Sequence, residues 1–480
     1  MRWLVVALVL APSLAHARDW FVAPGGSGDG SAGAPFGSIQ TAIGAAMPGD
    51  VIQVAAGTYM EALQTQRAGD AAATITIRGA DGAIVTAAGR TITIRHPFHV
   101  IENVVFDGQY GDDDAVRIES PAESLILRDC EVRRATRDCI DMGAPANVLI
   151  EGCLIHHCLN AANGRTDAHG IVGGSVRDLT IRNTEIHTFS GDAMQFDPGR
   201  AAPGWDRVIV EGCKLWLAPL PAPENGFSAG AVPGENAIDT KVLATAPVAH
   251  LTVRDTIAYG FRAGLITNMA AFNLKERVVA ELDGVTIYDS ELALRLRAPA
   301  DVTVKNAVIH DVLAAVRYED NIVTPHIYSS TFGSGITNAF VEASSSATMI
   351  DGKNVLVLGA LPPELSAMTG SLAVDATAFV DAAAHDYHLA AGSPAIDRGV
   401  EVPVTSDRDG NVRPHGAMHD VGAYEQCEPN CVAAPDAGSG GGNGDDEPGT
   451  PGGCCHAGEG EPPLPAFILV ALFAIRRRRR

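Results

Sequence analysis

The sequence is poor in aromatic residues, in positive charge and in paired cysteine motifs. Aromatic residues make up 5% of the 480 positions, which favours a narrow interior of small and branched aliphatic side chains. Lys and Arg number 35 against 57 Asp and Glu, giving a formal net charge of −22. Such a charge disfavours nucleic acid and anionic membranes as partners and favours cations. No CxxC pair points to a zinc site, and the nine cysteines form no dense disulfide framework.

The chain also lacks an apolar run of the roughly 20 residues that a membrane-spanning helix needs. The sequence MRW is followed by the short apolar run LVVALVLAPSL and by Ala15-His16-Ala17, a small-x-small cleavage pattern. These features predict a secretory signal peptide at residues 1–17 and therefore an exported protein.

The C-terminal end also carries an apolar run that is too short to span a membrane. Residues 426–453 are rich in Gly, Pro and acidic residues and are expected to form a linker. Residues 454–480 contain paired cysteines, a short apolar run and five terminal arginines, and this arrangement resembles the MYXO-CTERM sorting tails of myxobacterial surface proteins. The resemblance implies processing near Cys454-Cys455, envelope attachment and display at the cell surface. The alternative is a weak transmembrane anchor. Without signal peptide and tail, the net charge is near −26.

A short β-rich phrase recurs along the middle of the chain, as in LILRDCEV, VLIEGCLI and LTIRNTEI. Its polar centres are 23 to 43 residues apart and are Asp129, Gly152, Asn183, Gly212, Asp255, Asp283 and Asn306. One coil of about 23 residues buries nothing alone, so stacked coils must make the core. The fold class predicted is all-β, a single-stranded right-handed parallel β-helix with an N-terminal capping helix. Cys130 and Cys153 fall in one column, in a disulfide-compatible stack, and Cys427 and Cys431 are expected to close a small loop.

Both ends of the repeat region support this fold. Residues 21–59 look like the beginning of secreted pectate-lyase-like β-helices, with the capping helix at Pro35 to Ala46. Residues 386–425 resemble the closing module of that class. The expected organisation is a cap with the first coils at 18–90, repeats at 91–345 and a closing module at 346–425.

The candidate site lies where the longest insertions gather, between Gly152 and Asp283. Side chains on a strand alternate between faces, so Gln195 and Asp239 should point outward on neighbouring rungs. By the same reasoning Asp197 should lie beside Lys241. The outward row is expected to continue through Asn268, Arg295, Arg297 and Arg317.

These residues suit β-elimination on an anionic polysaccharide. Such a reaction needs a cation or Arg to neutralise the uronate, and a base to remove the adjacent proton. Hard oxygen ligands suit Ca²⁺. The predicted roles are Ca²⁺ ligands (Asp197, Glu235, Asp239), base (Lys241), uronate binding (Arg295, Arg297), sugar stacking (Trp216) and further substrate contacts (Gln195, Asn268, Arg262).

This residue set resembles the calcium-dependent β-helix polysaccharide lyases of the chondroitinase B and alginate lyase type. Those enzymes carry FRHG one coil after an acidic strand ending in Lys, whereas this chain has Phe261-Arg262-Ala263-Gly264. The resemblance implies a calcium-dependent lyase, with the His of that motif missing. A monomer is expected.

Other functions stay open. The runner-up is a non-catalytic adhesin or glycan-binding solenoid, in which Asp197 and Lys241 form an ordinary surface ion pair. A glycoside hydrolase or a uronan epimerase comes third. His156 and His157 occupy adjacent strand positions, so they are expected to point to opposite faces and to share no metal.

Overall fold

The computed structural model describes residues 17–434, except 162–166, 198–202, 265, 320–321, 344–348, 367 and 428. The predicted signal peptide (apart from its last residue), most of the linker and the sorting tail lie outside these residues. The chain divides into two units, Met1–Pro435 and Asp436–Arg480, and only the first contains described residues. Within the described part, no helix has the length and apolar character required to cross a membrane.

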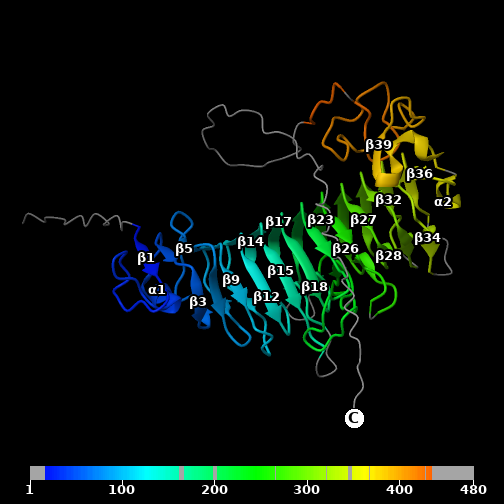
Figure 1. The fold of residues 1–480 in the computed structure, drawn as a ribbon. Coiled ribbons are helices and arrows are strands. Elements are labelled where there is room, and N and C mark those ends of the chain that lie inside the picture. Colours follow the sequence, from blue (N-terminus) through cyan, green and yellow to red (C-terminus); the bar gives the residue numbers. More distant parts are fainter. Residues whose placement is uncertain are drawn as a thin grey trace, which may run out of the picture. The chain divides into compact units, whose positions relative to one another are not determined.

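Three long sheets, all with parallel pairing, form the solenoid, and each coil adds one strand to each sheet in turn (Figure 1). The first sheet has 13 strands: β1 (Asp19–Val22), β2 (Val51–Val54), β5 (Ile75–Gly79), β8 (His99–Glu102), β11 (Leu125–Arg128), β14 (Ala146–Glu151), β17 (Arg177–Arg182), β20 (Asp206–Glu211), β23 (Ala249–Arg254), β26 (Val278–Asp283), β29 (Asp301–Lys305), β32 (His326–Tyr328) and β35 (Asp351–Lys353). The second sheet has 11: β4 (Leu63–Gln64), β7 (Ile92–Ile94), β10 (Val116–Ile118), β13 (Ile140–Met142), β16 (Ile171–Gly173), β19 (Met194–Phe196), β22 (Ile238–Thr240), β25 (Ala270–Leu274), β28 (Ser290–Leu296), β31 (Val312–Tyr318) and β34 (Asn338–Glu342). The third sheet has 13: β3 (Gly57–Met60), β6 (Ala83–Thr86), β9 (Val105–Asp107), β12 (Glu131–Ala135), β15 (Leu154–Cys158), β18 (Glu185–Phe189), β21 (Lys214–Trp216), β24 (Ile257–Tyr259), β27 (Thr286–Tyr288), β30 (Val308–Ile309), β33 (Thr331–Phe332), β36 (Leu356–Leu358) and β37 (Leu372–Val374). The predicted parallel β-helix is therefore confirmed.

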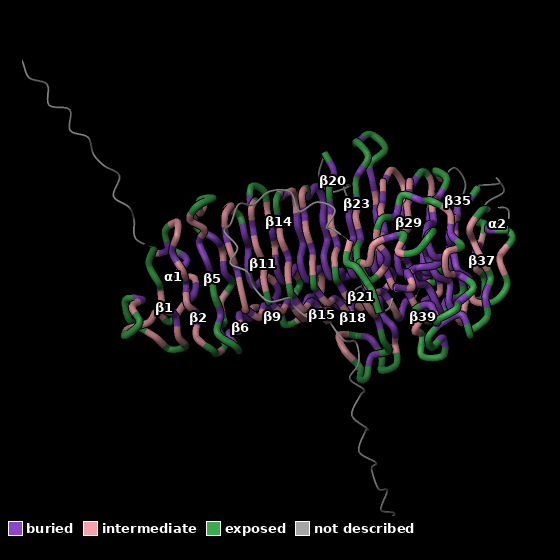
Figure 2. The backbone as a smooth tube through the Cα atoms, turned by 90° about the horizontal axis from the view of Figure 1, so that it is seen from above, coloured by how far each residue is buried: buried purple, intermediate pink, exposed green. Residues whose placement is uncertain are grey.

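The core is a set of stacked aliphatic columns inside the three sheets. On the second sheet, in-register residues at one inward position are all buried: Val116, Ile140, Ile171, Met194, Ile238, Phe272, Leu294 and Val316. Exposed residues gather in the turns along the sheet edges (Figure 2). Because a coil shields its neighbours, only the stack as a whole excludes water from these side chains.

The recurring polar centres lie in the turn between the first and third sheets, where the backbone is left-handed. Asp129 has φ 52° and Gly152 has φ 64°, and their counterparts along the stack also have positive φ. Asp, Asn and Gly tolerate this conformation better than other residues. In the coil of AELDGVTI the left-handed residue is Gly284, one position after the predicted Asp283.

From Asp129 to Gly284 this turn column alternates between a residue with a polar side chain and a glycine. A Cβ on Gly152 would lie 2.4 Å from Asp129 Oδ1, and one on Gly212 would lie 2.6 Å from Asn183 Oδ1. Gly284 has the same relation to Asp255, at 2.5 Å. Each of these glycines thus makes room for the polar side chain of the preceding coil.

Both ends of the stack are closed. The capping helix α1 (Ile39–Ala45) is shorter than predicted, because Phe36 forms a β-bridge with Val22 of β1 and Ser38 caps the helix. At the other end the coils run on to β37, beyond the expected boundary at 345. The closing module adds α2 (Pro363–Ser366), η3 (Ala376–Ala378), η4 (Ala382–Ala384) and the hairpin of β38 (Phe379–Asp381) with β39 (Asp386–Leu389).

The cysteines pair only partly as the sequence suggests. The predicted bond between Cys427 and Cys431 is present. Cys130 and Cys153 are buried free thiols, and the second disulfide joins Cys139 to Cys158. The thiols stack at the inward position after the left-handed turn, so their column reflects core packing.

Candidate functional site

The outer face of the second sheet carries a polar row whose register follows the expected alternation. Gln195 pairs with Asp239 on the neighbouring strand, as predicted. Asp239 pairs in turn with Asn273 of β25, and Asn273 with Arg295 of β28. Arg317 of β31 continues the row.

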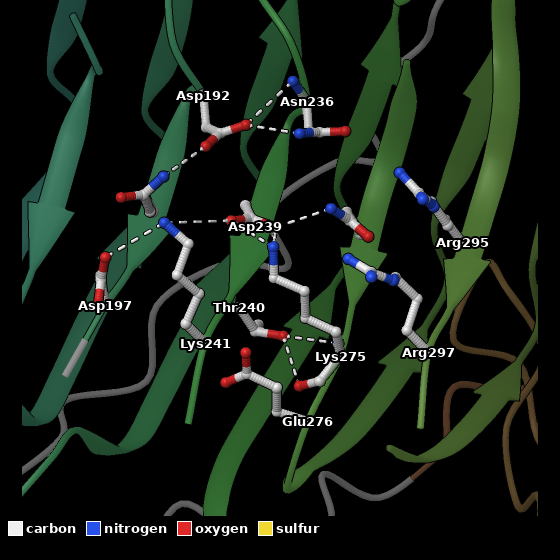
Figure 3. A network of polar contacts seen from close by, with 12 residues as sticks. Asp192, Asp197, Asn236, Asp239, Thr240, Lys241, Lys275, Glu276, Arg295 and Arg297 are labelled. Atoms are coloured by element: carbon white, nitrogen blue, oxygen red, sulfur yellow. Dashed lines mark hydrogen bonds and ion pairs between the residues drawn. The ribbon is translucent and has the colours of Figure 1, made fainter. Parts of the chain in front are cut away.

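A second row lies two residues further along each of these strands. It begins with Asp197 after β19 and continues with Lys241, Lys275, Arg297 and Glu319. Neighbouring strands are about 4.8 Å apart, so Lys241, Lys275 and Arg297 place three cations on consecutive rungs. We call these three residues the cation row (Figure 3).

Lys241 reaches back towards two carboxylates (Figure 3). Its Nζ lies 3.1 Å from Asp197 Oδ2 and 3.9 Å from Asp239 Oδ2. Burial favours loss of the proton, but Asp197 and Asp239 outweigh it and raise the pKa of Lys241 above its usual value. Its backbone is held on both sides, because its N–H donates to Phe196 O and its carbonyl accepts from Trp205 Nε1.

Asp239 is the buried acid at the centre of the arrangement, with 3% of its surface exposed. Lys275 Nζ lies 2.7 Å from Asp239 Oδ1, and Asn273 Nδ2 donates to the same oxygen at 2.8 Å. Burial raises the pKa of Asp239 to about 6, with a further contribution from Asp192, although Lys275 and Lys241 oppose it. Sequence reasoning missed both Asn273 and Lys275.

The two arginines share one carboxylate. Arg297 Nε donates to Glu319 Oε2 at 2.9 Å, and an Arg295 guanidinium nitrogen lies 3.4 Å from Glu319 Oε1. Burial, together with the neighbouring Arg297, lowers the pKa of the Arg295 guanidinium. Two guanidinium groups against one carboxylate leave a net positive charge at this end of the row.

Two predicted substrate contacts lie elsewhere. Asn268 precedes β25 and accepts a hydrogen bond from Arg317 at 2.8 Å, so Asn273 takes the rung position expected for it. Arg262 lies 3.1 Å from Asp289 and donates to the carbonyl of Asp311, outside the polar row. After Phe261 the next strand, β25, begins only at Ala270, and this displaces the rung from its predicted position.

Trp216 ends β21 on the third sheet and does not lie on the long loop beside Lys241. Its ring stacks between His187, at 4.4 Å between centroids, and Tyr259, at 5.8 Å. Its Nε1 donates to Glu185 at 2.6 Å. Both faces of the indole are covered, so the ring has only an edge to offer a sugar.

The predicted calcium ligands are not brought together. Oxygens of Asp197 and Asp239 are occupied by the ammonium groups of Lys241 and Lys275, whereas Glu235 lies before β22, four residues ahead of Asp239. Burial, with the charges of Asp192 and Asp167, raises the pKa of Glu235 to about 7. Calcium at Asp197, Glu235 and Asp239 therefore does not fit this arrangement.

A different set of acids is closer together. Among the described residues, Asp114, Asp138 and Asp141 are the only three potential ligands whose ligand atoms all lie within 4.8 Å of one another. Arginines compensate their charge: Arg117 pairs with Asp141, and Arg90 lies 3.5 Å from Asp114. The arginines offset part of this charge, but burial and the charges of Asp138 and Asp141 still raise the pKa of Asp114 to about 6.

An open groove of about 560 Å³ runs beside the cation row. Its walls include Asp197, Lys241, Glu276, Arg277 and Pro299. Lys241 lines this groove and its side chain is 34% exposed, so it can be reached from solvent.

Comparisons with known proteins agree with this architecture. No family model matches the sequence, and no curated protein matches it. Among solved structures, a rhamnogalacturonan lyase matches with a TM-score of 0.52 at 14% identity, over 76% of this chain and 91% of its own. The pectate lyase Pel9A matches with a TM-score of 0.50 at 15% identity, over 85% of this chain and 96% of its own. The shared feature is the fold. The chain is a parallel β-solenoid whose structural neighbours include polysaccharide lyases.

Proposed function

We propose that this protein acts on an anionic polysaccharide and cleaves it by β-elimination at a uronic acid. The observation that carries the proposal is the cation row, Lys241, Lys275 and Arg297, beside Arg295 on one outer face and next to a groove. A uronan carries a carboxylate on each uronic sugar, so evenly spaced cations on a parallel sheet complement its charge.

In the proposed reaction Lys275, Arg295 and Arg297 neutralise the uronate, which stabilises the negative charge that develops next to it. The neutral amine of Lys241 removes the proton beside the carboxylate. The electrons of that C–H bond form a carbon–carbon double bond, and the bond to the glycosidic oxygen breaks. The departing oxygen takes its proton from water.

Lys241 can act as the base only in its neutral, unprotonated form. Asp197 and Asp239 keep the ammonium form favoured, so only a small fraction of Lys241 is neutral near pH 7. The rate should therefore rise with pH. The calcium dependence expected from the sequence is left out of the proposal, because lysines occupy Asp197 and Asp239, and no step uses the ion.

Non-catalytic binding is the second candidate, and the same raised pKa favours it. A lysine that stays protonated beside two acids is suited to hold an anionic chain and unsuited to remove a proton. The signal peptide and sorting tail extend either proposal to a protein displayed on the cell surface. Epimerisation would begin with the same proton removal but would leave the chain uncut.

The test follows ultraviolet absorbance of the unsaturated product with pectate, alginate, chondroitin and heparan substrates at alkaline pH. We expect an increase with the wild type and none with Lys241→Ala or Lys241→Arg, because arginine keeps the charge but cannot act as the base. Lys353→Ala, on the first sheet, is the matched control and should behave as the wild type. If the protein is retained on an immobilised uronan but produces no absorbance change, it binds the polysaccharide without cleaving it, and the lyase proposal is wrong.

A further inference from the structure

The outer face of the first sheet carries a row of charged side chains whose sign alternates from coil to coil. The in-register residues on consecutive strands from β8 to β23 are Glu102, Arg128, Glu151, Arg182, Glu211 and Arg254. We call these six residues the charge row. The same alternation continues to Arg78 on β5, and to Asp283 and Lys305 on β26 and β29. The lyase proposal does not use this face, because the cation row belongs to the second sheet.

Some charges of this row are paired within the chain and others are not. Arg128 Nε lies 2.9 Å from Glu151 Oε2, and Arg182 Nε lies 2.6 Å from Glu151 Oε1. In the part of the chain that the structure describes, the side chains of Glu211 and Arg254 form no ion pair. The row as a whole is neutral, but two of its members have no partner of opposite charge.

A second outward row, two residues earlier on the same strands, is uncharged. It consists of Val100, Ile126, Leu149, Thr180, Ile209 and Thr252, all of them partly exposed. Two copies of a chain with a net charge of −22 repel each other, and this repulsion is weakest where the surface is neutral. The two rows together make a neutral, partly apolar strip on an acidic protein.

We propose that two copies of this chain associate through this strip as a two-fold symmetric dimer. The two-fold axis runs parallel to the strands, midway between β14 and β17, so each row faces the same row of the partner and the order of the coils is reversed. β14 then faces β17 of the partner, β11 faces β20, and β8 faces β23. An axis through a strand would instead set like charges against each other, so the alternation of sign selects the midway position.

Every charge in this arrangement lies opposite a charge of the other sign. The facing pairs are Glu151 with the partner's Arg182, Arg128 with the partner's Glu211, and Glu102 with the partner's Arg254. Glu211 and Arg254, which are unpaired within the chain, therefore both gain a partner, and this complementarity fixes the register of the two copies. In the uncharged row, Leu149 faces the partner's Thr180, and Ile126 faces the partner's Ile209.

The surface relief beside these rows is also complementary. An open groove of about 580 Å³ lies over the coils of β8 to β17, and Phe98 and Ser124 are among its lining residues. Arg207 and His250, on β20 and β23, carry side chains that are each 54% exposed. The reversed order of coils places Arg207 opposite the partner's Ser124 and His250 opposite the partner's Phe98. The long side chains of one half therefore face the groove in the other.

The size of the strip sets the strength of the association. Six strands about 4.8 Å apart and about 17 Å long cover about 500 Å² on each copy. The total of about 1,000 Å² is at the lower end for a specific interface, so we expect a reversible dimer. This dimer replaces the monomer expected from the sequence, and it leaves the cation row on the second sheet outside the interface.

The association is measured by sedimentation velocity of the purified mature protein over a range of micromolar concentrations. We expect a monomer–dimer equilibrium in the wild type. Leu149→Lys, next to the two-fold axis, should weaken the dimer at least about tenfold, because it buries an unpaired charge in the uncharged row. Thr303→Lys is the matched control: it occupies the same outward position on β29, beyond the facing strands, and should leave the equilibrium unchanged.

Two charge reversals test the register. Arg128→Glu and Glu211→Arg each create two like-charge contacts in a symmetric dimer, so each variant alone should be monomeric at concentrations where the wild type dimerises. An equal mixture of the two variants should dimerise, because both facing contacts of the mixed pair again join opposite charges. Effects within one chain are the same in the mixture as in the separate samples, so recovery on mixing reports contact between copies.

Circular dichroism and thermal midpoints establish that each variant is folded. If either reversal does not fold, Glu102→Arg with Arg254→Glu provides an equivalent pair. A wild type that stays monomeric at every concentration would overturn the proposal. A dimer that Leu149→Lys does not weaken, or a mixture as monomeric as its two components, would overturn it as well.

Discussion

Replacement of Asp197 by Asn tests how the acids beside Lys241 control its chemistry. The substitution keeps the shape of the side chain and removes a charge 3.1 Å from Lys241 Nζ. If Lys241 is the base, the reactive form is the neutral amine. Its fraction increases tenfold per pH unit below the pKa, so lowering that pKa makes the enzyme faster at a given pH.

The size of the effect follows from the separation and the exposure. Two unit charges 3.1 Å apart interact by about 1.3 kcal/mol in a medium as polar as water. Lys241 and Asp197 side chains are 34% and 24% exposed, so this solvent-screened value is the appropriate one. One pKa unit corresponds to about 1.4 kcal/mol, so the pKa of Lys241 should fall by about one unit in Asp197→Asn.

The assay is kcat/KM for product formation between pH 7 and pH 10. We expect the rising limb of the Asp197→Asn profile to lie about one pH unit lower, with up to about a tenfold gain near pH 8. Lys241→Ala combined with Asp197→Asn should remove the activity, and Glu276→Gln, across the groove, should leave the limb unmoved. A limb that stays in place, or moves to higher pH, would show that Lys241 does not act as the base.

Three further predictions follow from other contacts. Arg297→Ala should lower kcat/KM by about 10-fold to 100-fold through loss of a charge-assisted contact to the uronate, whereas Arg317→Ala, bonded to Asn268, should have a smaller effect. Thermal midpoints in millimolar calcium and in chelator should be equal, because lysines occupy Asp197 and Asp239. If calcium raises the midpoint of the wild type and no longer raises it in Asp239→Asn, calcium binds at Asp239 and this prediction is wrong. Gly152→Ala should destabilise the protein by about 1–2 kcal/mol in denaturant unfolding, because alanine resists the left-handed backbone. Gly143→Ala, where the nearest atom is 3.8 Å away, should change stability by less than about 0.5 kcal/mol.

The repeat pattern was sufficient to predict the fold and two pairs of neighbours in the site. The recurring Asp, Asn and Gly report a left-handed turn, which depends on local backbone sterics and is therefore visible in the sequence. The pairing of Gln195 with Asp239, and of Asp197 with Lys241, followed from strand alternation alone. These features recur at regular spacings, so they can be recognised from residue positions in the sequence alone.

The remaining errors come from interruptions of the period. The loop before β25 moved the rung from Asn268 to Asn273, and so hid Lys275 as well. The left-handed His157 broke the alternation that was expected to separate it from His156. Trp216 was expected on the long loop, but β21 extends to include it, and its ring therefore joins the stack on the third sheet. Each of these depends on where a loop rejoins the solenoid, which the polar pattern alone does not specify.

The alternation in the turn column has a consequence for how such a chain can change length. Asp129 projects into the space left by Gly152, Asn183 into that of Gly212, and Asp255 into that of Gly284. Loss of one coil from such a pair would set a glycine against a glycine, or two side chains next to each other, as Asn103 and Asp129 already lie in neighbouring coils. Loss of both coils of a pair preserves the pattern. In this central region two coils are therefore the smallest unit whose removal keeps the alternation, and shortened or extended variants that keep it differ by even numbers of coils.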